Sequence, residues 1–185
     1  MIDLNEKTRS AWLVKKISDE WKKGLLKSVG KGAGRFFAAA IVDVRGDGKL
    51  ITTGVNSVIK NKNPFDHAEV VAMKKGLKKL DILTYESYHV LVSSHEPCPM
   101  CIGAAYWSGI NRIFYLYTYE ETEKQFGVSG DIKLTRALAG RAHFRTSELL
   151  RLIPIDNKRL KKNLNTIYDG FTGYNKNLKD KTKIV

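Results

Sequence analysis

Ser93-Ser94-His95-Glu96-Pro97-Cys98-Pro99-Met100-Cys101 contains both cysteines of this 185-residue chain. Two cysteines with two residues between them can bind a metal ion or form a redox-active disulfide. On its own, the stretch leaves three interpretations open: a structural zinc site, a redox pair, and a pairing without a role. The upstream tetrapeptide Asp66-His67-Ala68-Glu69 is needed to choose among them.

The order of a His, a Glu two residues later, and then Pro-Cys-x-x-Cys is typical of zinc-dependent deaminases. His67, Cys98 and Cys101 supply three zinc ligands. A catalytic zinc ion takes three ligands from protein and leaves its fourth position to water, whereas a structural zinc ion needs four. The chain has no third cysteine to supply the fourth. We therefore predict one catalytic Zn²⁺ per chain.

Glu69 is the predicted catalytic proton carrier of this site. Zinc lowers the pKa of a bound water molecule to about 7, so that hydroxide is available at neutral pH. A carboxylate beside that water can take its proton and pass it to a ring nitrogen and to the leaving amine. Glu69 follows His67 by two residues, so their side chains can reach one pocket only in the first turn of a helix.

The predicted site lies where two helices begin. Asp66 is a suitable N-cap, and the apolar pattern after it predicts a helix over about 67–80. Cys98 and Cys101 are three residues apart and share a face of a second helix, expected over 98–109. The second helix is almost wholly apolar and is expected to be buried on all sides. Two helix N-termini, whose dipoles favour thiolates, should meet at one metal ion.

Hydrophobic patterns and turn residues predict the remaining elements, in which strands and helices follow one another. The expected helices cover residues 6–28, 119–126 and 156–168, and the expected strands cover residues 36–44, 49–59, 88–93, 112–117 and 149–155. Glycines interrupt residues 127–150, where no element is assigned. This order predicts a three-layer α/β/α fold, with helices on both sides of a mixed sheet.

The length and composition are those of a single globular domain. We expect residues 1–185 to form one domain, with a core at about 31–155, an N-terminal helix over 6–28, and a C-terminal helix and tail over 156–185. The hydrophobic fraction of 43% is ordinary, and no apolar run is long enough for a membrane span. No signal-peptide pattern is found and the thiols must stay reduced, so we predict a cytoplasmic protein.

The net charge of +13 is high, and basic residues are concentrated near the C-terminus, at Lys158, Arg159, Lys161 and Lys162. Such a cluster can bind nucleic acid, or it can be the solvated surface of a lysine-rich protein. No aromatic residue interleaves with this cluster, and lysine outnumbers arginine in it. The solvated surface is therefore favoured, and RNA is not the favoured partner.

Nearly half of the chain, from Phe36 to Tyr117, resembles the cytidine deaminase superfamily, and within it the guanine deaminase branch. The residues that carry the resemblance are Phe37-Ala38-Ala39-Ala40, Asn56, His67-Ala68-Glu69, Glu96-Pro97-Cys98-Pro99-Met100-Cys101 and Ala105-Tyr106-Trp107. The resemblance implies a five-stranded mixed sheet between helical layers. It also implies a hydrolase of purine metabolism that converts guanine to xanthine and ammonia.

The same resemblance implies a set of substrate contacts. Asn56, eleven residues before the zinc ligand His67, would form a hydrogen bond with the base. The backbone amide of Ala68 would bind a carbonyl group of the base. The walls of the base pocket would be Phe36 or Phe37 and Trp107.

Other residues near the motif are expected to be structural. His95 lies beside the motif, but its position varies in the family, so we do not expect it to be a fourth metal ligand. Glu96 is expected to support the metal loop through hydrogen bonds. His89 and His143 are given no role.

The guanine deaminase branch forms homodimers, in which a C-terminal residue such as Tyr168 or Tyr174 would reach the partner's substrate. That branch carries Gly-Phe-Asp after the fourth strand, where residues 125–131 of this chain match only in part. An acid from another position, Asp131 or Glu148, is expected to replace the missing contact to the purine.

Two other functions remain open. Deamination of adenosine in transfer RNA, or of cytosine or a nucleoside, would use the same motif. The basic charge favours the RNA substrate, whereas the long N-terminal segment that carries tryptophan argues against it. The other alternative is a basic RNA-binding protein with a residual zinc site, but such a protein would have no use for the carboxylate of Glu69.

Overall fold

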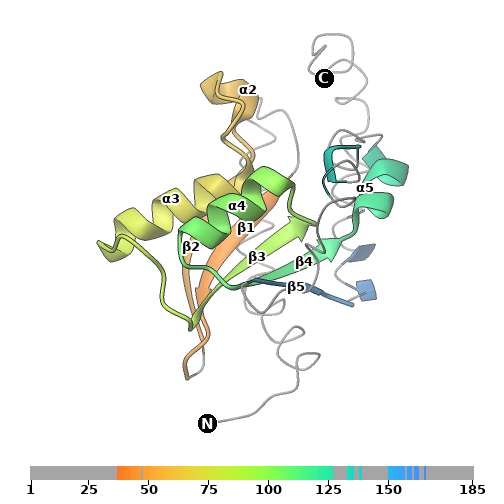
Figure 1. Cartoon of the computed structure of the whole chain (residues 1–185). Helices are drawn as coiled ribbons and strands as arrows, with labels where there is room; N and C mark the ends of the chain where they lie inside the picture. The colour runs from red at the N-terminus through yellow and green to blue at the C-terminus, as the bar shows by residue number, and fades with distance from the viewer. Residues whose placement is uncertain are drawn as a thin grey trace.

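The computed structural model describes residues 37–46, 48–126, 133–135, 138, 150–156, 158–159, 161–162 and 165 of the chain (Figure 1). Its strands and helices are β1 Ala38–Asp43, β2 Lys49–Val55, α2 Val58–Asn61, α3 Ala68–Leu80, β3 His89–His95, α4 Pro99–Trp107, β4 Arg112–Tyr117, α5 Tyr119–Phe126 and β5 Arg151–Pro154. The helix expected over 6–28 and the polar C-terminal tail lie outside the described residues.

The strands form one five-stranded sheet in the order β2-β1-β3-β4-β5. Strand β1 pairs antiparallel with β2 and β3, whereas β3, β4 and β5 run parallel. The sheet is therefore mixed, which confirms the predicted fold class. Strand β1 is buried from Ala38 to Val42, as its uninterrupted apolar run predicts.

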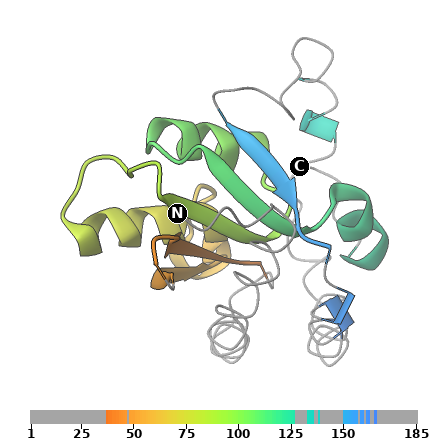
Figure 2. The ribbon, with the colours of Figure 1, turned by 90° about the horizontal axis from the view of Figure 1, so that it is seen from below.

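Helices α3 and α4 lie side by side on one face of the sheet (Figures 1 and 2). Apolar side chains from these helices and from the central strands form the core beneath them, among them Ile41, Ala72, Met73, Leu91, Ala105 and Ile113. The parallel strands β3 and β4 end at the same edge of the sheet, where His95 pairs with Tyr117. Helices α4 and α5 begin just beyond this edge, which is where ligands bind in sheets with parallel strands.

Gly54 allows the first turn of α3 to lie directly on β2. A Cβ atom built at this position would clash with the carbonyl oxygen of Ala68 and lie 2.5 Å from the backbone nitrogen of Ala72. Because both neighbours are backbone atoms of α3, a larger residue would push the helix off the strand. The N-terminal end of α3 can therefore lie this close to β2 only because Gly54 has no side chain.

We expect Gly54→Ala to destabilise the fold by about 1–3 kcal/mol, because the added methyl group overpacks this contact. Urea unfolding measures the change. Gly103→Ala is the matched control, since a Cβ at Gly103 in α4 meets nothing within 4 Å. Alanine favours a helix over glycine by about 1 kcal/mol, so the control should be neutral or stabilising. Equal stability of the two variants would contradict the close packing at Gly54.

The structure corrects the predicted N-cap of α3. His67 occupies the N-cap position instead of Asp66. The buried carboxylate of Asp66 accepts hydrogen bonds from the side chains of Asn61 at 2.7 Å and Asn63 at 3.1 Å, and it pairs with Lys74 at 3.4 Å. The bond from Asn61 is the main reason why the pKa of Asp66 lies below its usual value. Asp66 therefore fastens the loop before α3 and does not cap the helix.

Several boundaries also differ from the predicted ones. Strand β2 ends at Val55, and the short helix α2 follows it, because the side-chain oxygen of Asn56 accepts the N–H of Val58 at 3.3 Å and starts a turn. Strand β3 continues to His95, two residues further than expected. Helix α4 ends at Trp107, before Gly109 with its positive φ of 84°.

Helix α4 is not buried on all sides, contrary to the expectation from its composition. Only Cys101 and Ala105 are buried, whereas Tyr106 is 48% and Trp107 81% exposed. Across the described ranges, no helix is long and apolar enough to cross a membrane.

Candidate metal centre and adjoining cavity

His67, Cys98 and Cys101 meet at the N-terminal ends of α3 and α4. The sulfur of Cys98 lies 3.5 Å from Nδ1 of His67 and 3.5 Å from the sulfur of Cys101. The sulfur of Cys101 lies 3.7 Å from Nδ1 of His67. The structure thus brings together the three residues that were predicted as metal ligands.

These distances fit a tetrahedral zinc ion. With Zn–S bonds of about 2.3 Å and Zn–N bonds of about 2.0–2.1 Å, tetrahedral ligand atoms lie about 3.6–3.8 Å apart. A disulfide would bring the two sulfur atoms to about 2.05 Å, and both cysteines are free. The donor set and its spacing therefore suit zinc and leave room for a fourth, non-protein ligand.

The hydrogen-bonded sulfur atoms of Cys98 and Cys101 have pKa values shifted in opposite directions. The hydrogen bond between the two sulfur atoms, 3.5 Å apart, is the main cause that lowers the pKa of Cys98 to about 4. The same bond, together with burial, raises the pKa of Cys101. Cys98 is also the N-cap of α4, with Pro99 in the first turn, so the positive end of the helix dipole faces its sulfur.

Glu69 lies in the first turn of α3, directly beside the ligands. It is 6% exposed, its Oε1 accepts a hydrogen bond from the hydroxyl of Ser93 at 2.8 Å, and its Oε2 lies 3.5 Å from the sulfur of Cys101. Burial raises the pKa of Glu69, and the proximity of Cys98 adds to the rise. A buried carboxyl group with a raised pKa, beside metal ligands, is a candidate for proton transfer.

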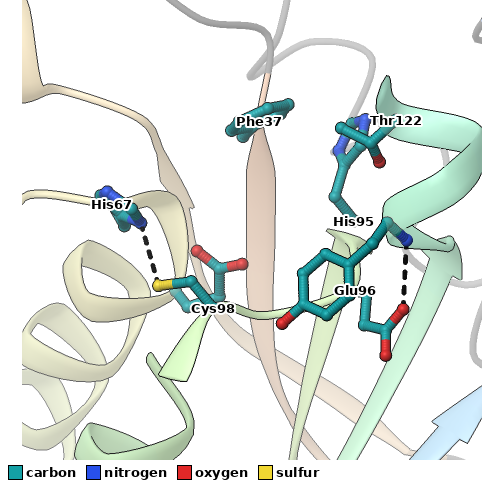
Figure 3. Close-up of a pocket in the computed structure, with 8 residues that line it drawn as sticks. Phe37, His67, His95, Glu96, Cys98 and Thr122 are labelled. Atoms are coloured by element: carbon teal, nitrogen blue, oxygen red, sulfur yellow. Dashed lines mark hydrogen bonds between the residues drawn. The ribbon is translucent and has the colours of Figure 1, made fainter. Parts of the chain in front are cut away.

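A cavity adjoins the ligands at the carboxyl edge of the sheet. Its lining residues come from the position just before β1, the start of α3, the end of β3 and the loop after it, and α5: Phe37, His67, Glu69, His95, Glu96, Cys98, Tyr119 and Thr122. In Figure 3, His67 and Cys98 lie on one side of the cavity, and His95, Glu96 and Thr122 lie on the other. Phe37 lies between the two groups.

The predicted substrate contacts are only partly at this cavity. Phe37 lines it, Phe36 lies outside the described residues, and Ala68 is buried as the first residue of α3. Asn56 is 2% exposed, and its backbone N–H donates to the carbonyl of Phe37 at 2.9 Å. Trp107 lies at the far end of α4 and is not among the residues that line the cavity.

Glu96 links the metal loop to α5. Its Oε2 accepts the N–H of Tyr119 at 3.1 Å, and its own N–H donates to the carbonyl of Tyr117 at 2.7 Å. His89 lies at the opposite end of β3, against the rings of Tyr85 and Tyr88. The remaining predicted candidates, Asp131, Glu148, Tyr168 and Tyr174, lie outside the described residues, as does His143.

Sequence reasoning missed four residues at the site. Ser93 orients Glu69, while Tyr119 and Thr122 line the cavity from α5. Tyr119 and Thr122 are three residues apart on a helix that follows a parallel strand, and this spacing could have indicated that both face the site. His95 was expected to be only structural, and the structure places it in the cavity wall.

The burial of His95 has a consequence for stability. Burial lowers its pKa from 6.5 to about 3. Between these pH values the unfolded chain binds a proton that the folded chain does not, so stability should fall as the pH falls through this window. The decline should reach about 1.4 kcal/mol per pH unit.

We expect His95→Leu to show a shallower loss of stability than the wild type between pH 6.5 and pH 4.5. Urea unfolding at several pH values measures both slopes. Metal binding also depends on pH, so the difference in slope between the variant and the wild type is the quantity that reports on His95. Parallel slopes would contradict a buried neutral histidine.

The profile of the cytidine and deoxycytidylate deaminase zinc-binding region matches residues 18–117, which is more than half of the chain. The chain belongs to this deaminase family. The matched region contains the three predicted ligands and Glu69. The family assignment therefore agrees with the distances between the ligand atoms, which suit zinc.

Relatives within the deaminase family include enzymes for free bases and for RNA. Guanine deaminase of Bacillus subtilis (strain 168) is 40% identical over 89 residues, which are 48% of this chain and 54% of that protein. A tRNA-specific adenosine deaminase of Buchnera aphidicola subsp. Baizongia pistaciae is 38% identical over 76 residues, 40% of this chain and 46% of that protein. The sequence matches thus extend over about half the length of these curated relatives.

A solved structure shares the fold over a greater length. The X-ray structure of guanine deaminase from Bacillus subtilis matches with a TM-score of 0.54 and 26% identity, over 82% of this chain and 91% of that chain. The five-stranded mixed sheet with its helices is therefore the cytidine-deaminase-like fold.

Proposed function

We propose that this chain is a zinc-dependent hydrolytic deaminase of a nucleobase, and that it converts guanine and water to xanthine and ammonia. The observation that supports this most directly is the buried carboxylate of Glu69, 3.5 Å from the sulfur of Cys101 within the three-ligand cluster. The similarity to the guanine deaminase of Bacillus subtilis supports guanine as the substrate.

His67, Cys98 and Cys101 would hold one zinc ion, which, when bound, lowers the pKa of a water molecule toward neutrality and supplies hydroxide for attack on the amino-bearing carbon. Glu69 accepts the proton of this water and delivers it to the neighbouring ring nitrogen. The carboxylate then moves a second proton from the added hydroxyl group to the amino group, and the C–N bond breaks as a C=O bond forms and ammonia leaves. The hydroxyl of Ser93 holds Oε1 of Glu69 at 2.8 Å, which fixes the carboxyl group for both transfers.

The base would be held by groups around this centre. Phe37 provides an aromatic wall, Asn56 a side-chain amide, and Ala68 a backbone N–H in the first turn of α3, where such groups have no partner within the helix. The hydrogen bond between the backbones of Asn56 and Phe37 ties two of these contacts together. Phe36 would contribute to the same wall.

A homodimer is part of the proposal. Tyr106 and Trp107 are exposed side by side at the end of α4, with ring centroids 5.6 Å apart. Large exposed aromatic residues on an apolar helix are typical of an interface. Trp107 could wall a base pocket only if a second chain brought a cavity to it, which agrees with the dimer.

We also propose that the chain acts as a single domain, and in the cytoplasm, where its thiols stay reduced.

Ammonia release from a panel of free bases, nucleosides and a tRNA anticodon hairpin tests the proposed function. We expect turnover of guanine, and at most slow turnover of adenine, cytosine and the nucleosides. Turnover of the hairpin alone would overturn guanine as the substrate and establish the RNA alternative. The absence of turnover on every substrate by the zinc-loaded protein would overturn deamination itself.

Deamination of adenosine in transfer RNA is the second candidate, favoured by the net charge of +13 and by the exposed Lys158, Arg159 and Lys162. Two lysines of α3 have a structural role instead, because Lys75 and Lys79 donate to the carbonyl oxygens of Thr53 and Ile51 on the edge strand β2. Filter binding of the tRNA hairpin at several salt concentrations distinguishes the RNA substrate from the free base. Weak binding at low salt would exclude the RNA substrate and also the RNA-binding alternative without catalysis.

A further inference from the structure

His95 is a buried polar residue in the wall of the cavity. It is the last residue of β3 and is 4% exposed. Its ring is packed between two aromatic rings, with the centroid of Phe37 at 4.3 Å and that of Tyr117 at 5.0 Å. A leucine would suit such an apolar environment, and burying an imidazole there has a desolvation cost. The polar group at this position therefore calls for a role other than packing.

The orientation of the His95 ring is fixed from several sides. Its Nδ1 forms a hydrogen bond of 2.8 Å with the hydroxyl of Ser94, and the same hydroxyl oxygen accepts the N–H of Ala38 at 3.0 Å. The stacked ring of Tyr117 is held in turn, because its hydroxyl donates to Lys161 O and lies 2.7 Å from Oδ1 of Asn165. Burial lowers the pKa of His95 to about 3, so the ring is neutral at pH 7 and can both donate and accept.

The cavity places His95 opposite the metal ligands. His67 and Cys98 line one side, and His95 lines the other together with Thr122 of α5 (Figure 3). A flat heterocycle that puts its reacting carbon beside the ligands must turn its far edge toward His95. A two-ring base extends further from the reacting carbon than a one-ring base, so the two classes differ in what they can present to this wall.

We propose that His95 is a specificity-determining residue, which contacts the edge of the heterocycle remote from the reacting carbon and favours two-ring, purine-type bases over one-ring bases. This inference rests on the proposed nucleobase deaminase function. In this proposal His95 determines which substrate binds, and His95 takes no part in proton transfer or metal binding.

The experiment compares His95→Leu, His95→Gln and His89→Leu with the zinc-loaded wild type. We expect His95→Leu to lower kcat/KM for guanine by about 10- to 100-fold, as for a lost buried hydrogen bond, and to change that for cytosine less than threefold. His95→Gln keeps a polar group and should recover part of the purine preference. His89→Leu is the matched control, because His89 is equally buried at the other end of the same strand and away from the cavity.

Dissociation constants of guanine and cytosine provide a second measurement that does not depend on turnover, and zinc content confirms an intact metal site. An unchanged ratio of guanine to cytosine in both kcat/KM and binding for His95→Leu would overturn the inference. Wild-type turnover of cytosine but not of guanine would overturn the proposed function. In that case, weaker guanine binding by His95→Leu than by the wild type would still support the contact, and equal binding would reject it.

Discussion

Glu69→Gln should retain zinc and lose turnover by at least 10³-fold. Glutamine has nearly the same shape and can still accept the hydrogen bond from Ser93, which lies 2.8 Å from the carboxylate. It cannot take a proton from water, and positioned acid–base groups contribute about 10²–10⁴-fold to rate. Because Glu69 would carry protons in more than one step, the upper part of this range is expected. Steady-state ammonia release and metal analysis of the same sample measure both properties.

Ser93→Ala is the informative companion to Glu69→Gln. It removes the group that orients the carboxylate and leaves the carboxylate itself in place, so a smaller loss of kcat, about tenfold, is expected. The pKa of Glu69 is raised by burial and lowered by the bond from Ser93. The acid limb of the pH–rate profile should therefore move to higher pH in Ser93→Ala.

Turnover of Glu69→Gln within tenfold of the wild type would remove Glu69 from the mechanism.

The metal centre could be predicted from the sequence because its chemistry is local. Cys98 and Cys101 lie on one helical turn, and His67 and Glu69 lie within three residues of each other. Ligand type and spacing therefore limited the possible sites before any tertiary structure was known. Strand β4 and helix α5 were also placed at their observed bounds, since each has a clear pattern and a short connection.

The cavity wall could not be predicted in the same way, because it depends on contacts between distant segments. The family resemblance placed Phe37 at the base pocket, but the sequence positions of His95 in β3 and Thr122 in α5 do not show that these two residues face the same space. The prediction that Asp66 caps α3 was wrong for a similar reason, because the carboxylate of Asp66 accepts hydrogen bonds from Asn61 and Asn63 instead. Composition also misled at α4, where an apolar sequence predicted burial and Trp107 is exposed.

Cys101→Ala should abolish zinc binding at micromolar metal and, with it, activity. The variant leaves only His67 and Cys98, and two protein ligands do not make the three-ligand set of a catalytic zinc site. Loss of a single group that merely orients a ligand costs about 10–100-fold in metal affinity, so loss of a ligand should cost more than 100-fold. Competition with a chromophoric chelator measures the affinity, and thermal unfolding with and without zinc measures the linked stability.

The choice of Cys101 also tests whether any other residue can complete the site. Its sulfur is fully buried between His67, Cys98 and Glu69, so alanine opens space that water or the carboxylate of Glu69 could enter. Wild-type affinity in Cys101→Ala would mean that water or the carboxylate of Glu69 can replace the thiolate, and it would contradict the three-residue metal site. His95→Leu is the control, because His95 lies on the other side of the cavity and should bind zinc as the wild type does (Figure 3). A loss of zinc in both variants would identify His95 as a ligand and contradict the three-residue site.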